Sequence, residues 1–215
     1  HLPPNVTVAM TTRADPGLPL ARLRSRGELL EIRAADLRFT QDEANVFLNR
    51  VMELDLDPES VAALEKRTEG WAAGLQLAAL SVRGVGGSSG AVSDFVDSFS
   101  GSHRFVLDYL VEEVLAGQSE QTRQFLIATS VLHQLTGELC DRLTGRNDGN
   151  ATLQALDRGN VFVVPLDEQR QWYRYHHLFA DALRARLASE SPSRVRDLHA
   201  AAGAWYAEQG MLSEA

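Results

Sequence analysis

The feature that most constrains this chain is a pair of β-rich runs set into an otherwise helical sequence. The stretch "NVFVVPLDEQRQWYRYHH" holds two runs rich in valine and aromatic residues, with a polar turn, Asp167 to Arg170, between them. Such a pair predicts a β-hairpin. A helical pattern over residues 177–188 follows the hairpin, and helical patterns precede it.

Helices followed by a hairpin are typical of a winged-helix arrangement. Thr40 and Glu43 predict a helix start with a capping box, and Asp57 with Pro58 predicts another with an N-cap and a proline at the first position. The apolar run "GWAAGLQLAALSV" predicts a buried helix, and Gly84 to Ser93 a flexible loop. Further helices are expected over residues 92–98, 104–116, 119–132, 137–143 and 151–158. The tail predicts a helix, Gly210, and the start of another helix.

Residues 5–12, "NVTVAMTT", predict a buried strand because they are rich in β-branched and apolar types. Few nearby segments are able to pair with it, so its neighbours are expected upstream in a longer protein. The expected fold is mainly α. It combines one leftover strand of an α/β domain, a helical bundle domain, and a winged-helix domain with a β-hairpin.

Composition excludes several classes of partner. The 215 residues are 44% hydrophobic and 23% charged, which is ordinary for a globular chain, and the formal net charge is −8. An acidic chain is a poor binder of nucleic acid or anionic membranes, which require surplus Lys and Arg. No apolar run reaches the roughly 20 residues that a membrane helix needs. The single cysteine, Cys140, predicts a buried thiol in a reducing cytoplasm.

Self-contained catalytic motifs are absent from the sequence. It contains no G-x-x-x-x-G-K-[ST], G-x-S-x-G, H-E-x-x-H or C-x-x-C pattern. His177 and Asp181 have a weak metal-binding spacing without third and fourth ligands, and the adjacent His176 and His177 make a poor metal pair. On motifs alone the chain is predicted to be non-catalytic and to bind no metal. The isolated histidines are expected to be ordinary hydrogen-bonded residues: His103, His133 and His199.

Arg13 ends the apolar run "VTVAMTTR". An arginine at the carboxyl edge of a buried strand points to where α/β sheets bind ligands, and its guanidinium can hold a phosphate with two hydrogen bonds. The alternative is a solvated arginine that begins a loop.

Four segments together resemble the MalT-type, large LuxR-family transcriptional activators of the STAND class of P-loop ATPases. They are "LPPNVTVAMTTRADPGLPLARLRSRGELLEIRAADLRFTQDEA", "RTEGWAAGLQLAALSVRG", "FSGSHRFVLDYLVEEVL" and "QWYRYHHLFADALRARL", and the resemblance covers nearly the whole chain. It implies the end of a nucleotide-binding domain over 1–38, a helical domain over 39–117, a winged helix over 118–190, and the start of a helical arm over 191–215.

The resemblance implies a role for the histidine pair. In related switch ATPases, the histidine of a Met-His-Asp motif at the start of a winged-helix helix reaches the β-phosphate of ADP. "YHHL" is similar, with Tyr175 for Met, His176 for His, and His177 in place of Asp. His176 is therefore the predicted phosphate contact. The alternative is a hydrogen-bonded structural corner.

The resemblance implies two further nucleotide contacts. Arg13 is similar to the arginine that senses the γ-phosphate. "GWAAG" resembles the segment that packs against adenine, matching Gly70 and Trp71, with Ala72 where a proline is usual. The competing interpretation of Trp71 is a helical core residue.

The function implied is a regulatory switch that closes over ADP in the resting state and opens on ATP and effector binding. ADP or ATP with Mg²⁺ would bind the parent protein, a slow P-loop ATPase. This segment lacks the Walker groups and is not expected to bind nucleotide tightly by itself. Implied partners are a sensor domain and its effector, with DNA bound only by a separate C-terminal domain. A cytoplasmic location is expected. Two alternatives remain. The chain is either a passive helical scaffold, or its winged helix binds DNA directly through a locally basic end. The basic residues at this end are Arg170, Arg174, Arg184, Arg186, Arg194 and Arg196.

Overall fold

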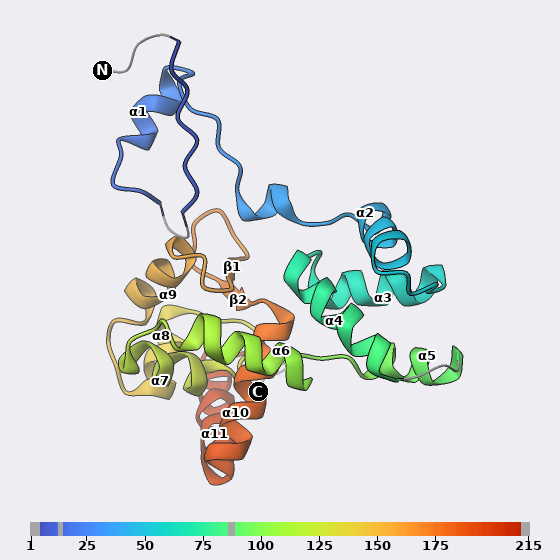
Figure 1. The fold of residues 1–215 in the computed structure, drawn as a ribbon. Helices are drawn as coiled ribbons and strands as arrows, with labels where there is room; N and C mark the ends of the chain where they lie inside the picture. The colour runs from blue at the N-terminus through green and yellow to red at the C-terminus, as the bar shows by residue number, and fades with distance from the viewer. Residues whose placement is uncertain (1–4, 13–14, 86–88, 212–215) are drawn as a thin grey trace.

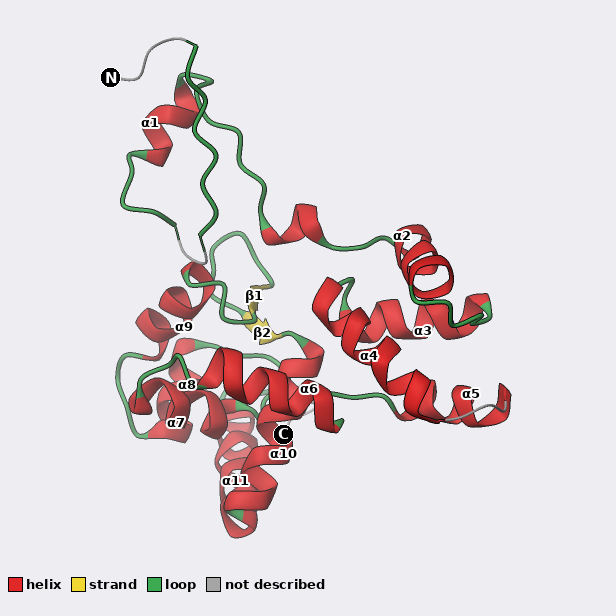
Figure 2. Ribbon diagram, viewed as in Figure 1, coloured by secondary structure: helices red, strands yellow, loops and turns green. Residues whose placement is uncertain are grey.

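The computed structural model describes residues 5–12, 15–85 and 89–211. Figure 1 shows three parts: an N-terminal segment that carries α1, a helical lobe containing α2 to α5, and a second lobe containing α6 to α11 and the hairpin. Figure 2 shows that nearly all regular structure is helical, with one small pair of strands. The predicted mainly helical fold with a hairpin is confirmed.

The first helical lobe begins with α2, whose capping box is confirmed. The Thr40 N–H donates to Glu43 Oε2 at 2.9 Å, and the Glu43 N–H donates to Thr40 Oγ1 at 3.3 Å. At the start of α3, the Ser60 N–H donates to Asp57 Oδ1 at 2.8 Å, with Pro58 at the first position. The lobe comprises α2 (Gln41–Asn45) with a π-helical continuation (Val46–Val51), α3 (Pro58–Thr68), α4 (Ala72–Val85) and α5 (Ser89–Ser98).

The loop predicted over Gly84 to Ser93 is wrong at both ends. Helix α4 continues to Val85 and α5 begins at Ser89, and residues 86–88 lie outside the described part of the chain. The physical reason lies in α5, where apolar residues recur at helical spacing and contact the core: Val92, Phe95 and Val96, followed by Phe99 just beyond the helix.

The second lobe contains the helices expected after residue 103. They are α6 (Arg104–Tyr109) with a π-helical continuation (Leu110–Leu115), α7 (Glu120–Thr129), α8 (Gly137–Thr144), α9 (Gly149–Arg158), α10 (His177–Glu190) and α11 (Pro192–Glu208). After α11, Gly210 has a φ of 75°. The helix expected to start beyond it lies mostly outside the described residues.

The hairpin pairs β1 (Val163–Pro165) with β2 (Tyr173–Tyr175) in antiparallel register, as predicted. Asp167 closes the turn, because its carboxylate accepts the N–H groups of Gln171 and Trp172 at 3.0 and 2.6 Å. Side chains alternate across a strand. Tyr173 and Tyr175 are therefore buried on one face, while Arg174 projects from the other toward the end of α3.

The N-terminal segment differs from the expectation. Residues 5–12 are exposed and belong to no strand among the described residues, so the buried strand predicted there is not formed within this chain. Apolar residues become a buried strand only when another strand pairs with them, and the one sheet of the described residues pairs β1 with β2 alone. Helix α1 (Leu20–Ser25) has no buried residue, and a single 3₁₀ turn (Ala34–Leu37) precedes α2.

One hydrophobic core runs through both lobes, from Ala44 to Tyr206. The segment that connects α5 to α6 packs closely on α10 at Gly101, where a Cβ atom would lie 1.7 Å from the carbonyl oxygen of Leu178. Cys140 is fully buried in this core and is a free thiol, as predicted, and burial raises its pKa. Within the described ranges, no helix is both long and apolar enough to cross a bilayer.

Candidate functional site at the junction of α3, α4 and α10

The site is built on a sharp turn between α3 and α4. Helix α3 ends at Thr68, and the next two residues, Glu69 and Gly70, have φ values of 50° and 69°. Two successive left-handed residues reverse the chain, so that α4 starts at once after Trp71. The carbonyl of Thr68 is left at the surface of the turn, where it accepts the N–H of Trp71 at 2.9 Å.

His176 approaches this turn from the second lobe. It is the residue before α10, it is 4% exposed, and its main-chain N–H donates to the carbonyl of Phe162 at 2.9 Å. Its ring Nε2 lies 2.9 Å from the carbonyl oxygen of Thr68. A carbonyl only accepts, so Nε2 carries the proton. Nδ1 is then an acceptor, buried and without a hydrogen-bond partner in the described structure.

Aromatic rings enclose the imidazole. The ring of His176 meets the rings of Trp71 and Phe162 edge to face, with centroids 6.0 and 5.5 Å apart, and Trp71 meets Phe162 at 5.1 Å. These separations are typical of favourable aromatic pairs. Phe162 has a φ of 51°, which is unusual for a bulky residue. Burial in this apolar surrounding lowers the pKa of His176, so the ring is neutral near pH 7.

Glu69 forms the polar half of the junction. Its side chain is 7% exposed, and Arg174 grips both carboxylate oxygens, at 2.7 and 2.8 Å. The main-chain N–H of His177 donates to Oε1 at 3.0 Å, and Nδ1 of His177 lies 3.1 Å from the same oxygen. A weaker ion pair joins Arg38 to Oε2 at 3.3 Å.

The charge of Glu69 depends on these partners. Burial raises the pKa of this carboxyl, but the hydrogen bonds from Arg174, the nearby ring of His176 and the His177 N–H outweigh burial and lower the pKa to about 2. Since His176 itself is neutral near pH 7, the guanidinium of Arg174 is the main source of this stabilisation. The pKa of Arg174 is raised in return, chiefly by its hydrogen bond with Glu69.

Of the four predicted site residues, the structure brings three together. Gly70, Trp71 and His176 meet at the junction, and Arg13 lies outside the described residues. Gly70 is required by the backbone, because its φ is positive and a Cβ atom would lie 2.4 Å from the carbonyl oxygen of Phe39. Trp71 packs as a half-buried core residue against Phe162 and Tyr109 as well as His176.

Sequence reasoning missed Glu69 and Thr68, and it named Arg174 only among the basic residues of the DNA-binding alternative. Glu69 and Arg174 are 105 residues apart, and neither belongs to a motif that links them. The sequence offered one indication of their importance, which is that each lies near a predicted site residue. Glu69 directly precedes Gly70, and Arg174 lies two residues before His176.

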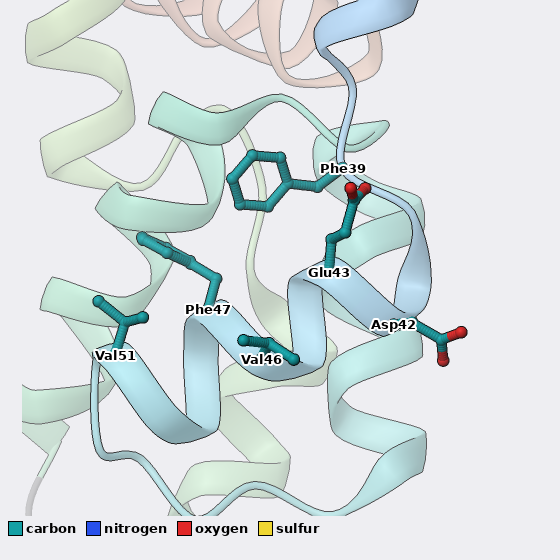
Figure 3. Close-up of a pocket in the computed structure, with 6 residues that line it drawn as sticks. All are labelled: Phe39, Asp42, Glu43, Val46, Phe47 and Val51. Atoms are coloured by element: carbon teal, nitrogen blue, oxygen red, sulfur yellow. The ribbon is translucent and has the colours of Figure 1, made fainter.

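A separate apolar groove lies along α2 and its π-helical continuation (Figure 3). It is open, with a volume of about 390 Å³, and Phe39 and Phe47 meet edge to face in it with ring centroids 5.6 Å apart. Phe39 also touches the junction through its backbone, because its N–H donates to the carbonyl of Gly70 at 2.8 Å. The groove is lined by Phe39, Asp42, Glu43, Val46, Phe47 and Val51.

Comparison with known proteins gives the relationship. A family model described as the MalT winged helix domain matches residues 111–195. The HTH-type transcriptional regulators MalT of Cronobacter sakazakii and Vibrio campbellii are 36% and 35% identical over 100% and 95% of this chain. The chain belongs to the MalT-type family.

The chain is also similar to proteins that are not named MalT. The serine/threonine-protein kinase PknK of Mycobacterium tuberculosis (strain ATCC 25618 / H37Rv) is 38% identical over 98% of this chain. This chain spans 24% of the Cronobacter regulator, 23% of the Vibrio regulator and 19% of the kinase. The MalT-type segment therefore occurs within proteins several times its length. One of these proteins is named as a transcriptional regulator and another as a kinase.

Proposed function

We propose that this MalT-type chain is the nucleotide-responsive joint of a transcriptional regulator, closed in the presence of ADP and opened by ATP and effector. The observation that carries the proposal is the contact of His176 Nε2 with the carbonyl of Thr68, beside Trp71 and Gly70. This contact joins the first helical lobe to the second lobe, which contains the matched winged helix and is called the winged-helix lobe below, at the residues for which the sequence predicts nucleotide contact. A ligand that favours the closed arrangement shifts the population in proportion to its differential contact with the two forms.

The unpaired ring nitrogen of His176, Nδ1, determines how the residue could contact a phosphate. Bound ADP supplies negative charge through its phosphates. Nε2 already donates to Thr68, so only Nδ1 is left, and Nδ1 donates a hydrogen bond only when the ring is protonated. Burial lowers the pKa of His176 in the free chain, and a neighbouring anion raises it. In this proposal His176 takes up a proton as it meets the phosphate, while its Nε2 keeps hold of Thr68.

The other predicted residues have distinct parts. Gly70 shapes the turn that presents the Thr68 carbonyl, and Trp71 forms the apolar wall against His176 and Phe162. Arg13 is proposed to sense the γ-phosphate. Adenine contact by Trp71 is proposed to involve the part of its half-buried ring that the neighbouring rings leave accessible.

The chain is proposed to act without catalysing a reaction itself, because it lacks the lysine and acidic groups that position phosphoryl transfer. ADP or ATP with Mg²⁺ is proposed to bind the full-length protein, which hydrolyses ATP slowly. A sensor domain with its effector and a separate DNA-binding domain are its proposed partners.

Direct DNA binding by the winged helix is the weaker candidate. The arginines that make this end basic are largely neutralised within the chain: Arg170 pairs with Asp157, Arg174 with Glu69, Arg184 with Asp181, and Arg186 with Glu190. Phosphate contacts need free cations that release counterions. We expect no gel shift by this chain at physiological ionic strength, and a salt-dependent shift would favour the DNA-binding alternative.

The test is ADP dissociation from the full-length protein, followed with a fluorescent ADP analogue. His176→Ala is expected to release ADP at least several-fold faster than the native protein and to raise basal activation. His133→Ala is the matched control, because His133 is an exposed histidine of the same lobe and is not one of the residues that form the junction. Equal release rates for the native protein and His176→Ala would refute the proposed function.

A further inference from the structure

Helix α10 begins without a cap of its own. No acidic residue stands in its first turn, and the side chain of the preceding residue, His176, makes no capping hydrogen bond because Nε2 is committed to Thr68. The first amide groups of a helix need acceptors from outside the helix. Here one acceptor comes from another lobe, since Glu69 accepts the N–H of His177 at 3.0 Å.

Glu69 is an unexpected residue for the turn in which it stands. Its φ of 50° lies in the left-handed region, where glycine is favoured and a residue with a Cβ atom is strained. Strained residues persist where the surrounding contacts hold them in place. For Glu69 those contacts include the two hydrogen bonds from Arg174 and the one from the His177 N–H.

The carboxylate touches the winged-helix lobe on both sides of His176. Arg174 lies two residues before the histidine, on β2, and His177 follows it, at the start of α10. A group that holds both flanking residues restricts the main chain at His176. The imidazole in turn reaches Thr68, which directly precedes Glu69. The two contacts thus join the same short segment of α3 to the same corner of the second lobe.

We propose that Glu69 is a positioning residue, which supplies from the end of α3 the N-terminal cap that α10 lacks and thereby fixes His176 against Thr68. The capping role stands on the contacts themselves. Its consequence for nucleotide retention rests on the function proposed above. An anionic group at the start of α10 is also favoured by the positive end of the helix dipole.

The test uses hydrogen exchange of the full-length protein without nucleotide. In Glu69→Gln the amides of residues 177–180 are expected to exchange several-fold faster, since the uncharged amide loses the paired grip of Arg174. The control is Glu190→Gln, which breaks an exposed ion pair with Arg186 at the other end of the same helix. Unchanged exchange over 177–180 in Glu69→Gln would overturn the proposal.

A second variant separates capping from general loosening. His177→Asp places a carboxylate in the first turn of α10, so in the Glu69→Gln background it is expected to restore most of the lost protection. In the native background the same substitution sets a second carboxylate against Glu69 and is expected to speed exchange. Failure of His177→Asp to restore protection in Glu69→Gln would overturn the capping role.

ADP release from the same variants distinguishes this proposal from the function it extends. Faster release from both Glu69→Gln and His176→Ala supports both. If exchange rises in Glu69→Gln while neither variant changes ADP release, the capping role stands and the proposed function fails. If His176→Ala releases ADP faster and Glu69→Gln does not, Glu69 does not act through His176 and the positioning role is overturned.

Discussion

Replacing Glu69 with glycine separates the turn from the ion pair. Glycine relieves the left-handed strain at a φ of 50°, a gain of about 1 kcal/mol, and costs roughly 0.5 to 1 kcal/mol through the greater freedom of the unfolded chain. These two backbone effects nearly cancel. A residue that served only the turn would therefore be replaced by glycine with little change in the free energy of unfolding.

Loss of the Glu69 carboxylate therefore determines how far Glu69→Gly lowers the free energy of unfolding. A pKa lowered from 4.5 to about 2 corresponds to about 3 kcal/mol of stabilisation at neutral pH. Because Arg174 and Arg38 are 26% and 41% exposed, solvent screens the pair and reduces this to roughly 2 kcal/mol. We expect Glu69→Gly to lower the free energy of urea unfolding by about 2 kcal/mol at pH 7.

The pH dependence supplies a second check. The pKa of Glu69 is lower in the folded chain than in the unfolded chain, so its contribution is complete above about pH 5 and is lost as pH falls toward 2. The difference between native chain and Glu69→Gly should therefore shrink to roughly half by about pH 3. A Glu69→Gly chain as stable as the native chain at pH 7, or a difference independent of pH, would refute the reasoning.

Three further expectations concern the core, the thiol and the nucleotide. Gly101→Ala places a Cβ atom against the carbonyl of Leu178 and should cost at least about 1 to 3 kcal/mol in urea unfolding, whereas Gly84→Ala, at an open helical position, should be neutral or stabilising. Cys140, whose pKa is raised by burial, should resist an aromatic disulfide reagent in the folded chain and react fully in denaturant, so rapid reaction of the folded chain would contradict its burial. If protonated His176 contacts the phosphate, ADP affinity should fall as pH rises from the lowered pKa of the free ring to its raised pKa in the complex. ADP itself also titrates, and this part of the pH dependence should be the same in His176→Ala. The variant should lack only the part that comes from the histidine.

Local signals in the sequence predicted local structure. The Thr40–Glu43 capping box, the Asp57 cap and the hairpin around Asp167 each depend on residues a few positions apart, and all three are present in the structure. Apolar spacing likewise gave the helices of the second lobe. These elements form because neighbouring residues alone satisfy the backbone groups at their ends.

Errors arose where distant residues decide the outcome. The run over residues 5–12 has the composition of a strand, but a strand needs a neighbouring strand, and the sheet of the described residues contains only β1 and β2. Glycine and serine between Gly84 and Ser93 suggested a loop, yet packing of Phe95 and Val96 into the core extends α5 to Ser89. Propensity is a weak signal that tertiary packing overrides.

The candidate site was predicted in part for the same reason. His176, Trp71 and Gly70 were found through short motifs, and the structure brings them together. The pairing of Glu69 with Arg174 depends on two segments meeting across 105 residues, which no local pattern records. The departure from the family pattern at His177 was visible in the sequence. The carboxylate that contacts this residue was visible only in the structure.

The most direct test of the central claim is hydrogen exchange of the full-length protein with and without saturating ADP. If the junction responds to nucleotide, ADP should slow exchange of the amides over residues 68–71 and 177–180, and leave those of α8, which lies away from the junction, unchanged. The same protection should be absent in His176→Ala. ADP binding that leaves residues 68–71 and 177–180 unprotected would contradict the account.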